Sequence, residues 1–111
     1  MTRSAQDLLP GSLDMLVLHC LNLKERHGFD VSQWVQEHTE GVLMTLDGAL
    51  YKALHRLEER RCLSSRWGRS VNGRKAKYYR ITDQGRAALS DEREAWSAFA
   101  AAVAQALAAE S

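Results

Sequence analysis

The side chains with the clearest chemical capacity in this sequence are cationic, and they crowd into one part of it. Between Lys52 and Arg86 the chain carries eleven lysine or arginine residues and three acidic ones, although its 111 residues have a net charge of only +1. Such a concentration is the electrostatic footprint of a face that meets a polyanion. From composition alone, a solvated charged surface is an equally good explanation. The choice between the two explanations depends on the helices and strands that carry these residues.

The side chains that could perform catalysis or bind a metal are scattered. The sequence has no glycine-rich phosphate loop, nucleophile elbow or paired-carboxylate motif. Four histidines fall on separate predicted elements, at spacings that match no metal site: His19, His27, His38 and His55. We expect His27 to hydrogen-bond at a helix start, and only His55 to belong to a functional site. The sequence therefore predicts neither an enzyme nor a protein with a metal or a cofactor.

Length and composition favour one folded unit without a membrane span. A chain of 111 residues amounts to about one domain. It has no apolar run long enough to cross a bilayer, and its start, MTRSAQDLLP, lacks the layout of a secretion signal. Cys20 and Cys62 fit no CxxC or Cys/His spacing, so we expect two reduced thiols. These features predict a cytoplasmic protein.

Hydrophobic periodicity predicts three helices before residue 62. Ser12 can cap the first, which is apolar on two sides. Its stripes consist of Leu13, Leu16, Val17, Cys20 and Leu21 on one side and of Met15 and Leu18 on the other. A second, short helix follows the HisGly break at residues 27 and 28. The third runs from about Leu46 to Arg61, with Thr45 at its N-cap.

The third predicted helix has two distinct faces. One is an apolar stripe made of Leu46, Leu50, Leu54 and Leu57, which can lock the helix to the first two. The other carries Gly48, Tyr51, Lys52 and His55, residues able to approach a phosphate closely, hydrogen-bond to it, neutralise it or donate to a base edge. This second face predicts a helix that lies in the major groove of DNA.

Beyond Cys62 the pattern predicts two antiparallel strands, LSSRWGR and KAKYYRIT, joined by a turn that contains AsnGly. We expect Leu63, Ser65 and Trp67 to pack with Tyr79 and Ile81, so that Trp67 and Tyr79 form a buried aromatic pair. The basic residues gather near the turn: Arg69, Arg74, Lys75 and Lys77. A hairpin with such a tip fits beside the DNA backbone or in a minor groove.

Three helices, a basic hairpin and a further helix make the plan of a winged helix-turn-helix, mainly α with a small β-hairpin. Residues 1–82 are predicted to form the DNA-binding domain and residues 83–111 a C-terminal dimerisation helix, within one folded unit. The predicted DNA contacts are Thr45, Gly48, Tyr51, Lys52, His55, Arg69, Arg74, Lys75 and Lys77.

The last helix, from about Asp83 to about Ala108 and capped by Thr82, has an apolar seam at heptad spacing. Such a seam on a lone helix needs another apolar surface to cover it. The second apolar stripe of the first helix needs one too, so we expect a twofold dimer. Its predicted interface consists of Met15, Leu18, Leu89, Trp96, Phe99, Val103 and Leu107. Two recognition helices would then read a palindromic site with half-sites about 34 Å, or a multiple of that, apart.

Five segments together resemble the PadR family of bacterial transcriptional regulators, in particular its small members. They are LLPGSLDMLVLHCL, HGFDV, GALYKALHRLEERRCL, GRKAKYYRIT and TDQGRAAL, in the same order and over nearly the whole chain. Lys52 stands where the family commonly has proline. The resemblance implies a winged-helix DNA-binding domain, homodimerisation through the C-terminal helix, and usually repression, often relieved by a small molecule. In some relatives an aromatic residue of that helix borders a hydrophobic ligand cavity, which makes Trp96 a candidate ligand contact as well as a packing residue.

Two other classes stay open on the sequence. A winged helix used for contact with protein or RNA would bind DNA weakly and would tolerate Tyr51→Ala. A small-molecule-binding dimer with a secondary DNA role would bind a hydrophobic dye that quenches Trp96 fluorescence. Neither the operator, the regulated genes nor the effector is encoded in a recognisable motif.

Overall fold

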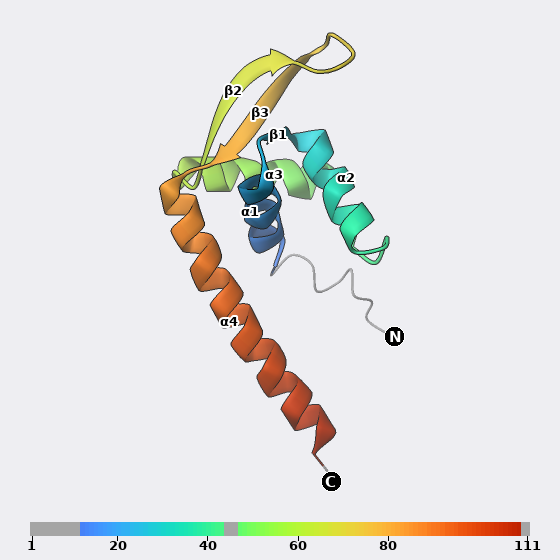
Figure 1. Cartoon of the computed structure of the whole chain (residues 1–111), viewed down its shortest axis with the longest axis vertical. Helices are drawn as coiled ribbons and strands as arrows, with labels where there is room; N and C mark the ends of the chain where they lie inside the picture. Colours follow the sequence, from blue (N-terminus) through green and yellow to red (C-terminus); the bar gives the residue numbers. More distant parts are fainter. Residues whose placement is uncertain (1–11, 44–46, 110–111) are drawn as a thin grey trace.

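The structure is a computed structural model that describes residues 12–43 and 47–109 of the chain. In chain order its elements are α1 (Leu13–Leu23), β1 (Arg26–His27), α2 (Gly28–His38), α3 (Asp47–Glu59), β2 (Leu63–Arg69), β3 (Lys75–Ile81) and α4 (Asp83–Ala108) (Figure 1). The predicted fold class, mainly α with a small β-sheet, is confirmed. Thr45 and Leu46 lie outside the described residues, so the predicted N-cap of the third helix stays a prediction.

Helix α1 lies at the centre of the core, because α2, α3, α4 and strand β3 all pack against it. The apolar stripe predicted for the third helix is buried, with Leu50, Leu54 and Leu57 each at most 1% exposed. The buried side chains that meet this stripe come from α1 and α2, and include Leu13, Val17, Cys20, Leu21 and Val31. Burial of one face leaves the other face of α3 in solvent.

The sheet has three antiparallel strands in the order β1-β3-β2. The hairpin of β2 and β3 was predicted, but β1 was not, because two residues carry no detectable alternation. At the hairpin tip the Gly73 N–H donates to the Ser70 carbonyl at 2.9 Å, and Gly73 adopts a φ of +76°. A left-handed residue is what such a turn requires, and glycine supplies it without strain.

The end of α3 and the start of α4 are tied together at three successive carbonyls. Gln84 Nε2 donates to the Arg60 carbonyl at 2.9 Å and Thr82 Oγ1 to the Arg61 carbonyl at 2.7 Å. The Thr82 N–H donates to the Cys62 carbonyl at 3.0 Å. These carbonyls belong to the residues that directly follow α3, so the turn after this helix is bonded to the start of α4.

Four helix starts were predicted from capping residues, and three of them lie within the described residues. Thr82 Oγ1 accepts from the Gly85 N–H at 3.0 Å, and His27 Nδ1 accepts from the Asp30 N–H at 3.3 Å, so both predicted roles are confirmed. Ser12 stands at the N-cap of α1, where its carbonyl accepts from the Leu16 N–H at 3.2 Å, but its side chain makes no capping hydrogen bond.

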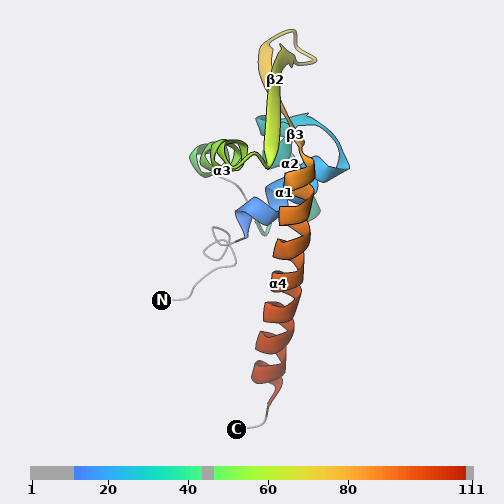
Figure 2. The same ribbon diagram turned by 90° about the vertical axis from the view of Figure 1, so that its left-hand side faces the viewer.

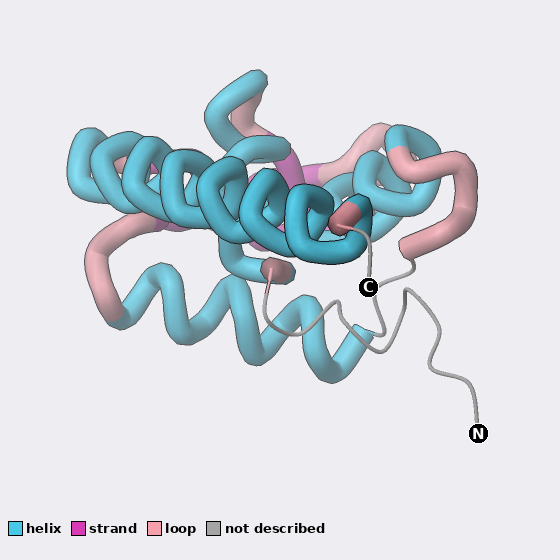
Figure 3. Tube along the Cα trace, turned by 90° about the horizontal axis from the view of Figure 1, so that it is seen from below, coloured by secondary structure: helices cyan, strands magenta, loops and turns pink. Residues whose placement is uncertain are grey.

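Helix α4 leaves the body of the molecule after its first turns. Only Gly85 and Leu89 of its 26 residues are buried. The helix then runs alone to the far end of the molecule, away from the hairpin of β2 and β3, which we call the wing (Figures 1 and 2). Viewed from below, α3 lies along one edge and the strands lie behind the helices (Figure 3). The wing and the free part of α4 therefore extend from opposite ends of the body.

Candidate nucleic-acid interface

The solvent-facing side of α3 carries the residues predicted to read DNA. Tyr51 is 53% exposed, and Gly48, Lys52 and His55 are also exposed. A Cβ atom on Gly28, at the start of α2, would lie 3.1 Å from the Tyr51 ring, so this ring rests on the first turn of α2. A Cβ atom on Gly48, by contrast, would meet no atom of the described residues within 4 Å. An incoming backbone can therefore approach α3 closely at this point.

A groove of about 820 Å³ separates the wing from the starts of α2 and α3. Aromatic side chains line it from both sides, and lysine and arginine side chains line it from the wing. Among them are Phe29, Tyr51, Trp67, Arg74, Lys75 and Lys77. The structure thus brings residues from both halves of the predicted site, the helix and the wing, to the walls of one groove.

The basic side chains of the site differ in whether a carboxylate lies beside them. Lys77 Nζ donates to Glu58 Oε1 at 3.1 Å, and His55 Nε2 lies 3.2 Å from Glu59 Oε1. Within the described residues no carboxylate pairs with the four other cations of the predicted site, which are Lys52, Arg69, Arg74 and Lys75. These four keep their charge available for a phosphate, whereas Lys77 and His55 would have to exchange a partner.

Glu58 sits where α3 meets the wing. It accepts a hydrogen bond from Ser65 Oγ as well as from Lys77. The Ser65 hydrogen bond and, after it, the contact with Lys77 hold the pKa of the Glu58 carboxyl below its ordinary value. The same contact with Glu58 raises the pKa of the Lys77 ammonium. The carboxylate form is therefore the one that joins α3 to β2 and β3.

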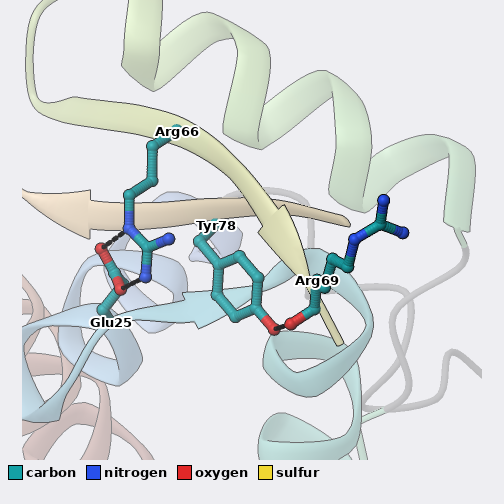
Figure 4. A network of polar contacts seen from close by, with 4 residues as sticks. All are labelled: Glu25, Arg66, Arg69 and Tyr78. Atoms are coloured by element: carbon teal, nitrogen blue, oxygen red, sulfur yellow. Dashed lines mark hydrogen bonds and ion pairs between the residues drawn. The ribbon is translucent and has the colours of Figure 1, made fainter. Parts of the chain in front are cut away.

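A polar network on the outer face of the wing holds it in position (Figure 4). Arg66 donates from Nη2 and Nε to the two carboxylate oxygens of Glu25, at 2.6 and 3.2 Å. Its guanidinium lies 5.0 Å from the centre of the Tyr78 ring, and the Tyr78 hydroxyl donates to the Arg69 carbonyl at 2.9 Å. Arg66 lowers the pKa of the Glu25 carboxyl through these hydrogen bonds. This network was not predicted from the sequence, because Glu25 and Arg66 are 41 positions apart in the chain.

The structure contradicts the predicted burial of Trp67. It was expected to pair with Tyr79 in a buried cluster, but it is 61% exposed, while Tyr79 and Ile81 are buried. Its cross-strand partner is Lys77, two residues further along the wing than the pair of Ser65 and Tyr79. The wing has left the body by that point. Lys75 Nζ lies 4.7 Å from the centre of the Trp67 ring.

Two residues of the predicted dimer interface are buried within the chain itself. Leu18 is 1% exposed and Leu89 is 3% exposed, because α1 and the first turns of α4 pack on each other. Their side chains are therefore covered within a single chain. Met15 is half-buried beside a small hollow that Trp96 also lines. The remaining predicted residues are exposed on α4: Trp96, Phe99, Val103 and Leu107.

Both cysteines are free, as their spacing predicted, and both are buried. Burial raises the pKa of the Cys20 thiol to about 11. Within residues 12–43 and 47–109 no cluster of three or more His, Cys, Asp or Glu could hold a metal ion. No helix in this described part is long and apolar enough to span a membrane.

The chain resembles known transcriptional regulators both in sequence and in fold. The Transcriptional regulator PadR-like family model matches residues 17–91. A transcriptional regulator of Mycobacterium tuberculosis is 40% identical over 79 residues, which cover 71% of this chain and 70% of that protein. The crystal structure of a PadR-like transcriptional regulator from Bacillus cereus superposes with a TM-score of 0.80 at 26% identity, covering 94% of this chain and 99% of that one. A PadR family regulator from Eggerthella lenta gives a TM-score of 0.81 at 28% identity, covering 94% and 88%.

A helical body with a two-stranded wing beside an exposed helix defines the winged-helix class of transcription regulators. The match over residues 17–91 narrows the class: the chain belongs to the PadR-like family of transcriptional regulators. It is accordingly a regulator of transcription and not an enzyme.

Proposed function

We propose that this protein is a sequence-specific DNA-binding repressor that acts as a dimer on a palindromic operator. The observation that carries the proposal is the groove between α3 and the wing, which is lined by Arg74 and Lys75, two cations that no carboxylate neutralises within the described residues. A groove of this kind matches the charge of one DNA strand.

In the proposed complex α3 enters the major groove. Lys52 neutralises a phosphate and Tyr51 donates to a phosphate or packs on a sugar, which fix the register of the helix. His55 donates to a base edge, and this contact carries sequence information. Gly48 lets the backbone come close, in agreement with the open space around it. Thr45 completes the set as a phosphate contact at the start of the helix.

The wing supplies the second set of contacts in this proposal. Arg69, Arg74, Lys75 and Lys77 meet the backbone or enter the adjacent minor groove, where the negative potential favours arginine. The network of Glu25, Arg66 and Tyr78 supports this role, because it holds the wing at a fixed angle to the body without using any of the four cations. A wing held in this way does not have to be ordered on binding, which saves part of the entropic cost.

The free part of α4 is proposed to pair with a second copy of the chain. Its exposed apolar side chains lie on one helix at heptad-like spacing, with Trp96 and Phe99 rings 6.2 Å apart. Exposed aromatic surface of this kind is stabilised when a partner covers it. Residues 1–82 then form the DNA-binding part and residues 83–111 the dimerisation helix, and two copies of α3 would face a palindrome.

A small hydrophobic effector belongs to the same proposal. Trp96 lines a hollow of about 290 Å³ with Met15 and His19, and the second subunit would turn this hollow into a closed space. A flat apolar molecule stacked on Trp96 would alter the packing of the two α4 helices, and with it the distance between the two recognition helices. Relief of repression would follow from that change.

The experiment that tests the proposed function is fluorescence anisotropy on the DNA upstream of the protein's own gene. A scrambled duplex of equal length is the control, and both are titrated at several salt concentrations. We expect a preference of about 10³-fold or more for the native fragment, with steep salt dependence. Equal and weak binding to both duplexes would contradict a sequence-specific role.

A further inference from the structure

Trp67 is a large apolar side chain that lines the groove and that the monomer fold leaves exposed, as it does Phe29 and Val71. It is 61% exposed in the middle of strand β2, although tryptophan burial is strongly favourable. It lies on the face of the wing that lines the groove, opposite to the face that holds Arg66 and Tyr78. Trp67 is therefore not part of the network of Glu25, Arg66 and Tyr78. Its exposed ring could instead be covered by a molecule that binds in the groove.

Lys75 has an unusual position relative to this ring. Its ammonium lies 4.7 Å from the centre of the Trp67 ring, a cation–π contact that orients the charge without neutralising it. Within the described residues no carboxylate pairs with Lys75. The wing thus presents an apolar ring and a free positive charge side by side, both directed into the groove that Tyr51 lines from α3.

We propose that Trp67 packs its ring against a deoxyribose of the DNA strand that lies in this groove, while Lys75 pairs with the adjacent phosphate. The inference rests on the proposed function and adds to it a contact that carries no charge. A DNA strand alternates apolar sugar rings with charged phosphates, so an aromatic ring beside a cation matches one repeat of the strand. The apolar surface of Trp67, exposed in the free protein, is covered in the complex.

Salt dependence separates this contact from an electrostatic one. Trp67→Ala should weaken binding about tenfold and leave the slope of log affinity against log salt unchanged, because an apolar contact releases no counterion. Lys75→Ala should lower the slope by about 1. Leu23→Ala is the matched control, because Leu23 is an exposed apolar residue, 55% exposed, that does not line the groove. It should bind like the wild type.

Fluorescence gives a second reading on the same residue. The double variant Trp34→Phe, Trp96→Phe keeps Trp67 as its single tryptophan. On addition of the operator duplex its emission should shift to shorter wavelength or be quenched, and added salt should reverse the change together with the anisotropy signal. Thermal unfolding of Trp67→Ala should match that of the wild type, since the ring is mostly exposed.

Three outcomes would overturn the inference. The first is wild-type affinity in Trp67→Ala, and the second is unchanged Trp67 emission while anisotropy reports binding. The third is a lower salt slope in Trp67→Ala, which would mean that the ring serves only to position Lys75. Absence of specific binding by the wild type would instead reject the proposed function, and the inference with it.

Discussion

Glu58 Oε1 accepts a hydrogen bond from Lys77 Nζ at 3.1 Å, and this contact joins helix α3 to strand β3 of the wing. It divides the cations of the site into two groups. Lys77 is already neutralised by Glu58, whereas Lys52 and Arg74 have no carboxylate partner within the described residues. The two groups should respond differently to substitution.

Replacement of Lys52 or Arg74 by alanine should weaken binding to all DNA sequences alike and lower the salt slope by about 1 for each lost phosphate contact. Lys77→Ala should lower the slope by less, because its loss also frees the Glu58 carboxylate beside the DNA. Anisotropy titrations at several salt concentrations measure all three slopes. Equal slopes for Lys52→Ala, Arg74→Ala and the wild type would place the DNA face elsewhere.

His55→Ala should change the sequence preference of binding and not the affinity for all DNA. A contact to a base edge discriminates between sequences by about 1–3 kcal/mol, so its loss should relax the preference at one position of each half-site. Binding to non-specific DNA should hardly change. A set of operator duplexes with single base-pair changes gives the measurement, and an unaltered preference at every position would remove His55 from the recognition set.

The contact of Glu58 with Ser65 and Lys77 predicts a pH dependence of stability. The folded pKa of Glu58 lies below its ordinary value, so its contribution is present above that value and is lost as the pH falls through the folded pKa. Glu58→Gln should therefore flatten the fall of the urea midpoint between about pH 5 and pH 3. The difference should stay under about 1 kcal/mol, because the pair is partly exposed. A wild-type and a Glu58→Gln curve that run parallel through this range would contradict the assignment.

Gly85 should be intolerant of any side chain. A Cβ atom there would lie 2.1 Å from the Cys62 carbonyl oxygen, a backbone atom held in place by the Thr82 N–H. Gly85→Ala should cost about 3 kcal/mol or more, measured by thermal or urea unfolding. Gly48→Ala is the control, since Gly48 has open space around it on a helix and should gain up to about 1 kcal/mol. Its DNA affinity should nevertheless fall, as Gly48 is proposed to admit a close backbone.

The dimer can be tested by charge. Trp96→Asp combined with Phe99→Asp adds two like charges to the exposed seam of α4 and should give a monomer by light scattering, with loss of tight operator binding. Folding of the body should survive, because both residues lie beyond the buried first turns of α4. A dimer that persists would move the interface to another surface.

The two thiols should be unreactive in the native state. Cys20 and Cys62 are both buried, and burial raises the pKa of the Cys20 thiol to about 11. A thiol reagent at about pH 8, near the ordinary thiol pKa, should label neither cysteine in the folded protein and both in denaturant. Rapid labelling of one cysteine without unfolding would show that its environment is more open.

Elements with a strong local signal were predictable from the sequence. The buried and exposed sides of α3 follow from the spacing of Leu50, Leu54 and Leu57, and the start of α4 from the capping residue Thr82. Elements that depend on contacts between distant parts of the chain were not predictable from the sequence. β1 exists only because its two residues pair with β3, and Trp67 is exposed because the wing extends beyond the body, which no alternation pattern encodes.

The same limit applies to the site. The sequence could place the cations on α3 and on the wing, but not decide which of them would meet a carboxylate, since Lys77 and Glu58 are 19 positions apart. It also assigned Leu18 and Leu89 to a surface, because an apolar stripe on a helix looks the same whether a neighbouring helix or a second chain covers it.

The three carbonyls of Arg60, Arg61 and Cys62 have a mechanical consequence. Gln84 and Thr82 bond to all three, so the turn that follows α3 is joined directly to the start of α4. Helix α4, with 26 residues, is about 39 Å long. Under the proposed function, a displacement of its free end should therefore reach the turn after α3 and change the angle at which α3 meets DNA.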